Sequence, residues 1–153
     1  MKISAELLSH FFRALRLKLT GLSSEVGNEE PIARLIHDKS YFRAEDGYVS
    51  TAVFHPRKVS VDLSALRLLR CSLRDVWGIA DRLDSRRSDG RRAVARADLE
   101  AKRYRDMELR LNALAPGHVR HVNIEGWPEK GKLEMVKSHL AHSATLQVRP
   151  RVS

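Results

Sequence analysis

The chain has 153 residues, of which 42% are hydrophobic and 31% are charged. A chain of this length and composition folds as one globular unit that buries roughly two thirds of its unfolded surface, which excludes an intrinsically disordered protein. The only cysteine, Cys71, excludes an intrachain disulfide and favours a reducing compartment. No apolar run approaches the ~20 residues of a membrane-spanning helix, and the first residues lack a signal-peptide pattern. We therefore expect a cytoplasmic protein.

The net charge of +9 comes mainly from the middle of the chain. Residues 57–105 hold 14 lysines and arginines against 7 acidic residues, and most of these cations are arginine. The planar guanidinium group makes forked contacts to phosphate and carboxylate groups. This composition predicts an anionic partner, either a nucleic acid or an acidic protein.

The first segment, Ser4–Thr20, has the periodicity of an amphipathic helix, which Ser4 can cap and Gly21 can end. Its apolar residues recur at helical spacing, and they are Leu7, Leu8, Phe11, Phe12, Leu15 and Leu19. The basic residues near its other side are Arg13, Arg16 and Lys18. Such a helix packs on its own domain, or it docks on a partner or a membrane surface. In the second case Leu8, Phe12 and Arg16 are the candidate partner-binding residues.

Residues 21–30 are polar and rich in turn formers, as is typical of a linker. We therefore divide the chain into an N-terminal helix and linker, residues 1–30, and a single α+β domain, residues 31–153. Pro31 suits the first position of a short helix through Ile36. The β pattern that follows comprises Tyr41–Arg43, an Asp46-Gly47 turn, Tyr48–Phe54, and an alternating piece at Val59 and Val61.

The second half of the chain mixes helical and extended patterns. Ser72 and Asp75 resemble a capping box for a helix that carries Val76, Trp77, Ile79, Ala80 and Leu83. Further elements are predicted as a charged helix over Ala93–Arg105, strands over Glu108–Leu114 and His118–Ile124, a helix over Lys132–Ala144, and an edge strand over Thr145–Arg149. Because helices and strands do not alternate regularly, we expect an α+β fold: a small mixed or antiparallel sheet packed with about four helices.

The densest basic segment is Arg86-Arg87-Ser88-Asp89-Gly90-Arg91-Arg92. It is either a loop that contacts the phosphates of a nucleic acid or a solvated loop without a partner. The candidate nucleic-acid-binding residues are Arg86, Arg87, Arg91, Arg92, Arg96, Arg57 and Lys58. Aromatic residues make up only 6% of the chain and are not interleaved with the basic ones, which argues against a stacking platform for single strands.

His121 and Asn123 lie on one side of a predicted strand that leads into Gly126-Trp127-Pro128. This order is half of a two-histidine phosphoesterase pattern, in which one imidazole acts as base and a second as acid. His55 is the only plausible second histidine from sequence, and it lacks the matching hydroxyl residue. In such an enzyme Arg120 or Arg57 would neutralise the phosphate. The alternative is that His121 and Asn123 only bind neighbouring backbone.

Other chemistry has little support in the sequence. His139 and His142 share a helix face, but no third ligand accompanies them, so we expect no metal site. No phosphate-binding loop, dinucleotide fingerprint or nucleophile elbow is present, and we expect no cofactor. Cys71 has no local partner and is more typical of a core residue than of a nucleophile.

Several collinear segments between Ile36 and Leu146 form a recognisable order. They are Ser40-Tyr41-Phe42, Ala52-x-Phe54-x-Pro56, Val59-Ser60-Val61, Ala95-Arg96-Ala97-Asp98-Leu99, His121-Val122-Asn123-Ile124-x-Gly126-Trp127-Pro128, and Leu140-Ala141-x-x-Ala144-Thr145-Leu146. In this order the chain resembles an uncharacterised bacterial family of small stand-alone proteins. The resemblance implies a bacterial, cytoplasmic, single-domain protein and carries no activity. Asp62 departs from the pattern, and the helix up to Thr20 lies outside it.

The sequence thus favours a basic, non-catalytic binding protein, either a nucleic-acid-binding protein or a subunit of a bacterial assembly. Two alternatives remain open. One is a small phosphoesterase or nuclease-like enzyme that uses His121. The other is an immunity or antitoxin-type module that binds a protein.

Overall fold

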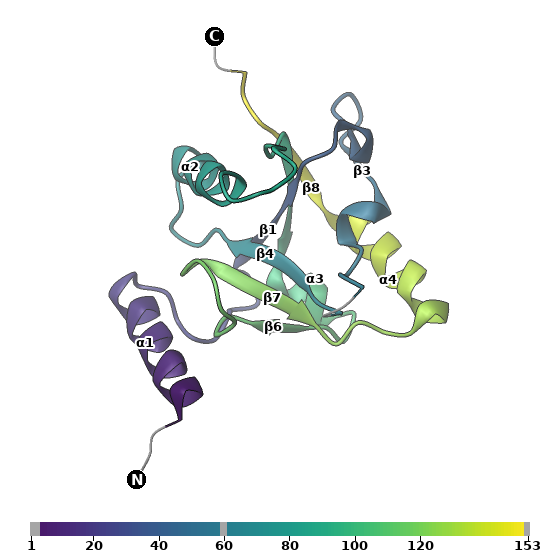
Figure 1. Cartoon of the computed structure of the whole chain (residues 1–153). Helices are drawn as coiled ribbons and strands as arrows, with labels where there is room; N and C mark the ends of the chain where they lie inside the picture. The colour runs from purple at the N-terminus through teal and green to yellow at the C-terminus, as the bar shows by residue number, and fades with distance from the viewer. Residues whose placement is uncertain (1–3, 59–60, 152–153) are drawn as a thin grey trace.

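The computed structural model describes residues 4–58 and 61–151. Six strands form one antiparallel sheet in the order β6-β7-β4-β1-β5-β8, and β2 and β3 pair as a separate hairpin (Figure 1). The strands are β1 (Pro31–Ile36), β2 (Phe42–Arg43), β3 (Tyr48–Val49), β4 (Leu63–Arg67), β5 (Ala95–Glu100), β6 (Arg110–Asn112), β7 (His121–Glu125) and β8 (Thr145–Val148). This arrangement confirms the α+β class and makes the sheet antiparallel.

The helices cover the sheet unevenly. They are α1 (Ala5–Leu19), α2 (Leu73–Asp84), α3 (Ala101–Arg105) and α4 (Lys130–Ser143), with short 3₁₀ turns η1 (Lys39–Tyr41) and η2 (Thr51–Phe54). In Figure 1, α2 and α4 lie on opposite sides of the sheet, and α1 stands apart at one end. Four α-helices match the number expected.

The hydrophobic core is divided by the sheet into two unequal clusters. The larger one gathers Phe54, Tyr104 and Leu140 against the strands, beneath η2, α3 and α4. The smaller one lies beneath α2 and centres on Leu35 and Ile79. Because side chains alternate along a strand, one strand such as β1 serves both clusters. The apolar cluster on the α2 side of the sheet is therefore the smaller of the two.

Four predicted elements are confirmed within a residue or two of their ends. The helix from Ser4 to Thr20 appears as α1, with the Ser4 hydroxyl accepting from the Leu7 N–H. The Ser72 cap accepts from the Asp75 N–H and begins α2. The remaining two are α4 and the edge strand β8. These elements have strong local signals, such as a cap, an amphipathic face or a terminating proline.

Two predicted helices are wrong, because their residues form the centre of the sheet. Residues Pro31–Ile36 are β1, which pairs with β4 on one side and with β5 on the other. Of the predicted helix over Ala93–Arg105, residues Ala95–Glu100 form β5 and only Ala101–Arg105 is helical. A strand buried on both faces has a nearly continuous apolar pattern, which periodicity cannot separate from a short helix.

The remaining β predictions are partly right. The Tyr48–Phe54 strand ends at Val49, and its second half forms η2. The expected strands over Glu108–Leu114 and His118–Ile124 shorten to β6 and β7. Strand β4 was not predicted. Of the expected piece at Val59 and Val61, Val59 lies outside the described residues and Val61 has a positive φ of 49°.

A buried ion pair joins the linker to the sheet. Arg67 on β4 is fully buried, and its Nε and Nη2 donate to the two carboxylate oxygens of Glu30 at 2.6 and 2.9 Å. Its Nη1 donates to the Ser23 carbonyl at 2.6 Å. The guanidinium therefore holds the segment between α1 and β1 against the end of the interior strand β4, where both charges are buried.

We expect Arg67→Met to destabilise the fold by about 3–5 kcal/mol, because it leaves the Glu30 carboxylate buried without a partner. The double variant Arg67→Met/Glu30→Leu should recover a large part of this loss, since it removes both charges. Urea unfolding of the wild type, both single variants and the double variant gives the coupling energy. Additive losses would show that the pair makes no specific contribution.

Candidate functional site

One arginine attaches α1 to the rest of the protein. The Arg13 guanidinium donates hydrogen bonds of 2.8 to 3.1 Å to the backbone carbonyls of Ala113, Gly117, His118 and His121. These carbonyls belong to the turn between β6 and β7. Arg13 therefore fixes the position of α1 and the conformation of this turn together.

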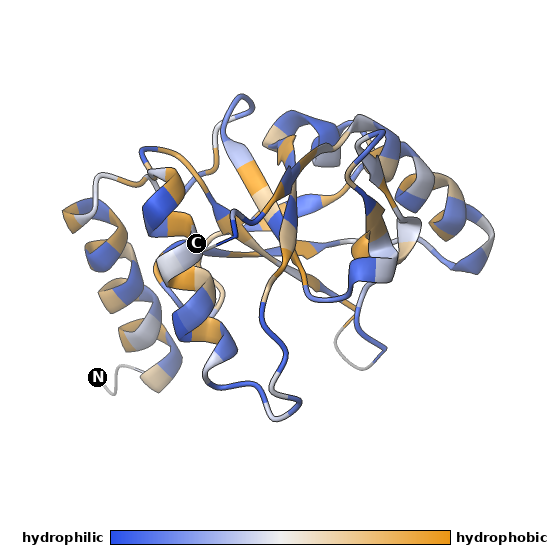
Figure 2. Ribbon diagram, turned by 90° about the horizontal axis from the view of Figure 1, so that it is seen from above, coloured by the Kyte–Doolittle hydropathy of each residue, from blue (hydrophilic) through white to orange (hydrophobic). Residues whose placement is uncertain are grey.

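The apolar stripe of α1 faces away from the protein. Leu17 is buried, whereas Leu8 and Phe12 are 43% and 55% exposed. Figure 2 shows the apolar residues along α1 at the edge of the molecule. The interpretation of the stripe as a core-packing face is therefore wrong: Arg13 points inward instead. The predicted partner-binding residues Leu8, Phe12 and Arg16 are all exposed, and their partner stays a prediction.

A basic hollow lies between α1, α2 and the β6–β7 turn. We call it the cationic groove, and its volume is about 530 Å³. Its charged and titratable lining consists of Arg16, Arg82, Arg86 and His118, with no carboxylate among the lining residues. Within residues 4–58 and 61–151, none of the three arginine side chains has a hydrogen bond or an ion pair. Their charges are therefore compensated only by solvent.

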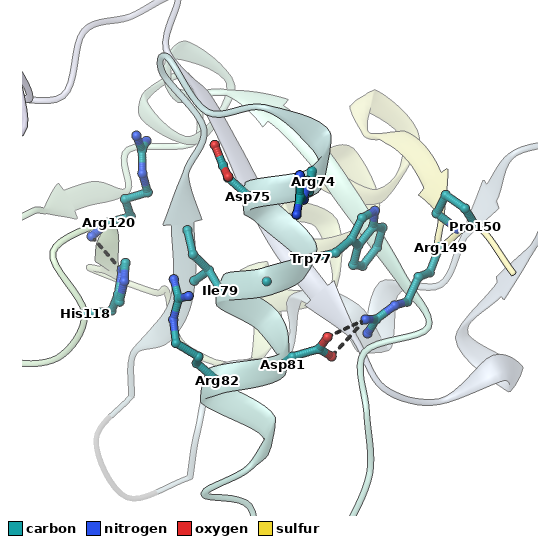
Figure 3. Close-up of a pocket in the computed structure, with 11 residues that line it drawn as sticks. Arg74, Asp75, Trp77, Ile79, Asp81, Arg82, His118, Arg120, Arg149 and Pro150 are labelled. Carbon is teal, nitrogen blue, oxygen red and sulfur yellow. Dashed lines mark hydrogen bonds and ion pairs between the residues drawn. The ribbon is translucent and has the colours of Figure 1, made fainter. Parts of the chain in front are cut away.

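A second, shallower hollow of about 710 Å³ continues over α2 and includes Arg82, His118 and Arg120 (Figure 3). It also includes Asp81, which accepts from Arg149 at 2.8 Å and from Arg92 at 2.7 Å. These hydrogen bonds lower the pKa of Asp81 to about 2, so it is ionised and neutralised in place. The same hollow also includes the Asp75 carboxylate on α2, so its lining carries charges of both signs.

The pKa of His118 responds to the charges that line the cationic groove. Burial lowers the pKa of its imidazole, and the charges of Arg82 and Arg120 lower it further. Its Nδ1 accepts the Arg120 backbone N–H at 3.1 Å, an arrangement that requires an unprotonated Nδ1. Both observations describe a neutral imidazole surrounded by cations.

The predicted arginine loop is largely neutralised by one acid of the loop and two acids from other segments. Arg87 pairs with Asp89 at 2.6 Å, Arg91 approaches Asp38 at 3.6 Å, and Arg92 pairs with Asp81 at 2.7 Å. Only Arg86, of the four loop arginines, is free of such contacts in the part of the chain that the structure describes. It extends the cationic groove beyond α2.

The other predicted nucleic-acid-binding residues are dispersed. Arg96 is buried and pairs with Asp98 at 3.0 Å, so it cannot reach a polymer at the surface. Lys58 is exposed next to residues that the structure does not describe. Arg57 lies on the α2 side of the sheet and lines a different, smaller hollow. Sequence reasoning missed Arg82 on α2, whose only signal was its position four residues before Arg86 in the sequence.

His121 and Asn123 share the α2 side of the sheet, as predicted from strand alternation. The His121 Nδ1 lies 2.8 Å from the Pro116 carbonyl oxygen, and Asn123 donates to Asp62 at 3.1 Å. His55 is exposed after η2 and lines none of the hollows described above. The histidine that shares a hollow with His121 is instead His37, which follows β1.

The two histidines that share a face of α4 lie at the surface. His139 and His142 are exposed on α4. Across residues 4–58 and 61–151, no three histidine, cysteine or acidic side chains gather closely enough to bind an ion. In the same residues, no helix combines the length and apolar character needed to cross a membrane.

Comparisons with protein-family models, with curated proteins and with solved structures gave no match. The resemblance to an uncharacterised bacterial family therefore stays a prediction, and the function is inferred from the geometry of this chain alone.

Substitutions of buried and of exposed residues of α1 should differ in how much they change the free energy of unfolding. Leu17→Ala creates a cavity in a fully packed site and should cost about 2–5 kcal/mol. The double variant Leu8→Ser/Phe12→Ser should change the free energy of unfolding by only about 0.5 kcal/mol per site, because both side chains are exposed. Thermal unfolding at low protein concentration measures both. A large loss in the double variant would place the stripe in a packed interface.

The pKa of His118 tests the potential in the cationic groove. The neighbouring arginines disfavour the imidazolium, so Arg82→Gln should raise the pKa of His118 towards its usual value of about 6.5. A phosphate-rich ligand in the groove should raise it as well, because anions favour the charged form. Titration of the imidazole C–H signals by NMR measures both shifts. An unchanged pKa in Arg82→Gln would mean that burial alone sets the value.

Proposed function

We propose that this protein is a basic, non-catalytic binding protein that holds nucleic acid through its phosphates in the cationic groove. The observation that carries the proposal is the set of three uncompensated guanidinium groups, Arg16, Arg82 and Arg86, around one hollow without a lining carboxylate. Each belongs to a helix or to its immediate end, so their spacing is held by the fold.

The chemistry of the groove matches a phosphate backbone better than a base edge. Guanidinium groups bind phosphate oxygens in forked geometry, and neutralising consecutive phosphates releases counterions. Among the described residues, the groove lining contains no phenylalanine, tyrosine or tryptophan, and its only aromatic ring is the imidazole of His118. Binding of this kind is sensitive to salt and largely insensitive to base sequence.

The neutralised loop provides a control with the same change in net charge. The triple variant Arg16→Gln/Arg82→Gln/Arg86→Gln should weaken binding to a random-sequence duplex and reduce the slope of log K against log salt by about 2 to 3. The matched variant Arg43→Gln/Arg91→Gln/Arg92→Gln combines two loop arginines with the paired Arg43. It should keep nearly the wild-type slope, because Asp46, Asp38 and Asp81 already engage those arginines. Fluorescence anisotropy across a salt series gives both slopes.

Three results would contradict the proposal. Equal losses in the two triple variants would show that net charge alone matters and that the groove is not a site. Absence of binding to both DNA and RNA at low salt would remove the nucleic-acid function. Tight binding of an acidic polypeptide without binding of nucleic acid would favour an acidic protein partner instead.

A further inference from the structure

A separate hollow of about 290 Å³ lies on the α2 side of the sheet, beneath the C-terminal end of α2. Its polar lining comes from five segments that are distant in sequence. These residues are Arg34, His37, Arg57, Ser64, Asp84, Arg87 and His121. Leu83 lines both this hollow and the cationic groove, so the two are close neighbours.

The only carboxylate that lines the hollow is already engaged. Asp84 has a side chain only 3% exposed, and one oxygen lies 2.7 Å from the His37 Nε2. The other oxygen accepts the Ala93 N–H at 2.7 Å. Because a carboxylate only accepts, the His37 Nε2 carries a proton. The Asp84 carboxylate is therefore fixed in position by His37 and Ala93, and its negative charge offsets part of the positive charge of the lining arginines, Arg87 among them.

Three guanidinium groups approach the hollow from different directions. Arg34 is held by the carbonyls of Val53 and Ser64 at 3.1 and 3.0 Å, and burial, together with the charges of Arg57 and Arg87, lowers its pKa to about 10. Arg57 is held by the Ser64 hydroxyl. Asp62 lies 3.9 Å from Arg57, outside the lining of the hollow.

Arg87 is oriented by Asp89, which also lies outside the lining. Arg57 and Arg87 are therefore both partly exposed, and each is held by a hydrogen-bond partner, Ser64 for Arg57 and Asp89 for Arg87. A dianion inside the hollow would meet guanidinium groups on more than one side, which is the geometry of a phosphate site.

His121 adds a hydrogen-bond acceptor to these cations. The Pro116 carbonyl can only accept, so the 2.8 Å contact assigns the proton to the His121 Nδ1. Burial, and then the neighbouring Arg13 and Arg57, lower the pKa of the imidazole, which favours its neutral form. In that form Nε2 carries a lone pair and accepts a hydrogen bond from a hydroxyl group.

We propose that this hollow binds a small phosphate monoester that also carries a hydroxyl group, such as a pentose phosphate. Arg57 and Arg87 contact the phosphate, and the His121 Nε2 accepts from the hydroxyl. The small volume excludes a polymer, so the ligand is either a free sugar phosphate or the phosphorylated end of a nucleic-acid strand. The site is independent of the cationic groove and remains if the proposed function fails.

Calorimetric titration with ribose 5-phosphate and with inorganic phosphate tests the site. Arg57→Gln should weaken binding of both ligands by about ten-fold or more. Because the Arg57 side chain is exposed, the variant should fold as the wild type does. His121→Phe should weaken ribose 5-phosphate and leave inorganic phosphate nearly unchanged. The variant Arg103→Gln is the matched control, because Arg103 is an exposed arginine on α3 that lines neither hollow, and it should bind both ligands as the wild type does.

The two sources of the phosphate are separated by oligonucleotides with and without a 5′-phosphate. Tighter binding of the phosphorylated strand, lost in Arg57→Gln and kept in Arg103→Gln, would assign the hollow to a strand end. Equal binding of the two strands, with ribose 5-phosphate bound through Arg57, would assign it to a free sugar phosphate. Failure of the wild type to bind ribose 5-phosphate at millimolar concentration, or equal weakening in Arg57→Gln and Arg103→Gln, would overturn the proposal.

Discussion

The hydrogen bonds of Arg13 connect every part of the molecule to which we assign a function. One guanidinium group holds four carbonyls of the β6–β7 turn. That turn presents His118 to the cationic groove and leads directly to His121 in the smaller hollow. The same contact places Arg16, one helical turn further along α1, at the wall of the groove. Burial and the nearby charges of Arg16 and Arg67 lower the pKa of Arg13, so carbonyl dipoles stabilise a cation in an unfavourable position.

The sequence was informative at the periphery of the fold and misleading at its centre. Capping residues and amphipathic faces located α1, α2 and α4, because these signals are local. The residues of β1 and β5 contain alanines, arginines and leucines that favour helices in isolation. Their pairing with two neighbouring strands each outweighs that preference, since pairing satisfies their backbone groups and buries both faces. Such pairing is a property of the whole sheet, which no short window of sequence contains.

The candidate sites show the same difference between local signals, which the sequence contains, and contacts between distant segments, which it does not. Counting arginines predicted a basic protein but not which arginines are free, because Asp38 and Asp81 come from other segments to neutralise Arg91 and Arg92. Strand alternation correctly placed His121 and Asn123 on one side. It did not identify His37 as the neighbour of His121 in the same hollow, since the two are separated by 84 positions and meet only through the order of the strands.

The distribution of acids argues that the free cations are not a by-product of composition. The chain has 19 acidic residues, enough to partner most of its 28 cations. In the described residues, acids are matched to Arg87, Arg91 and Arg92 in the loop, whereas Arg16, Arg82 and Arg86 share a hollow without one. Grouping like charges destabilises the folded chain by mutual repulsion. An anion that occupies the groove removes this repulsion, so the arrangement that weakens the free protein also provides the driving force for binding.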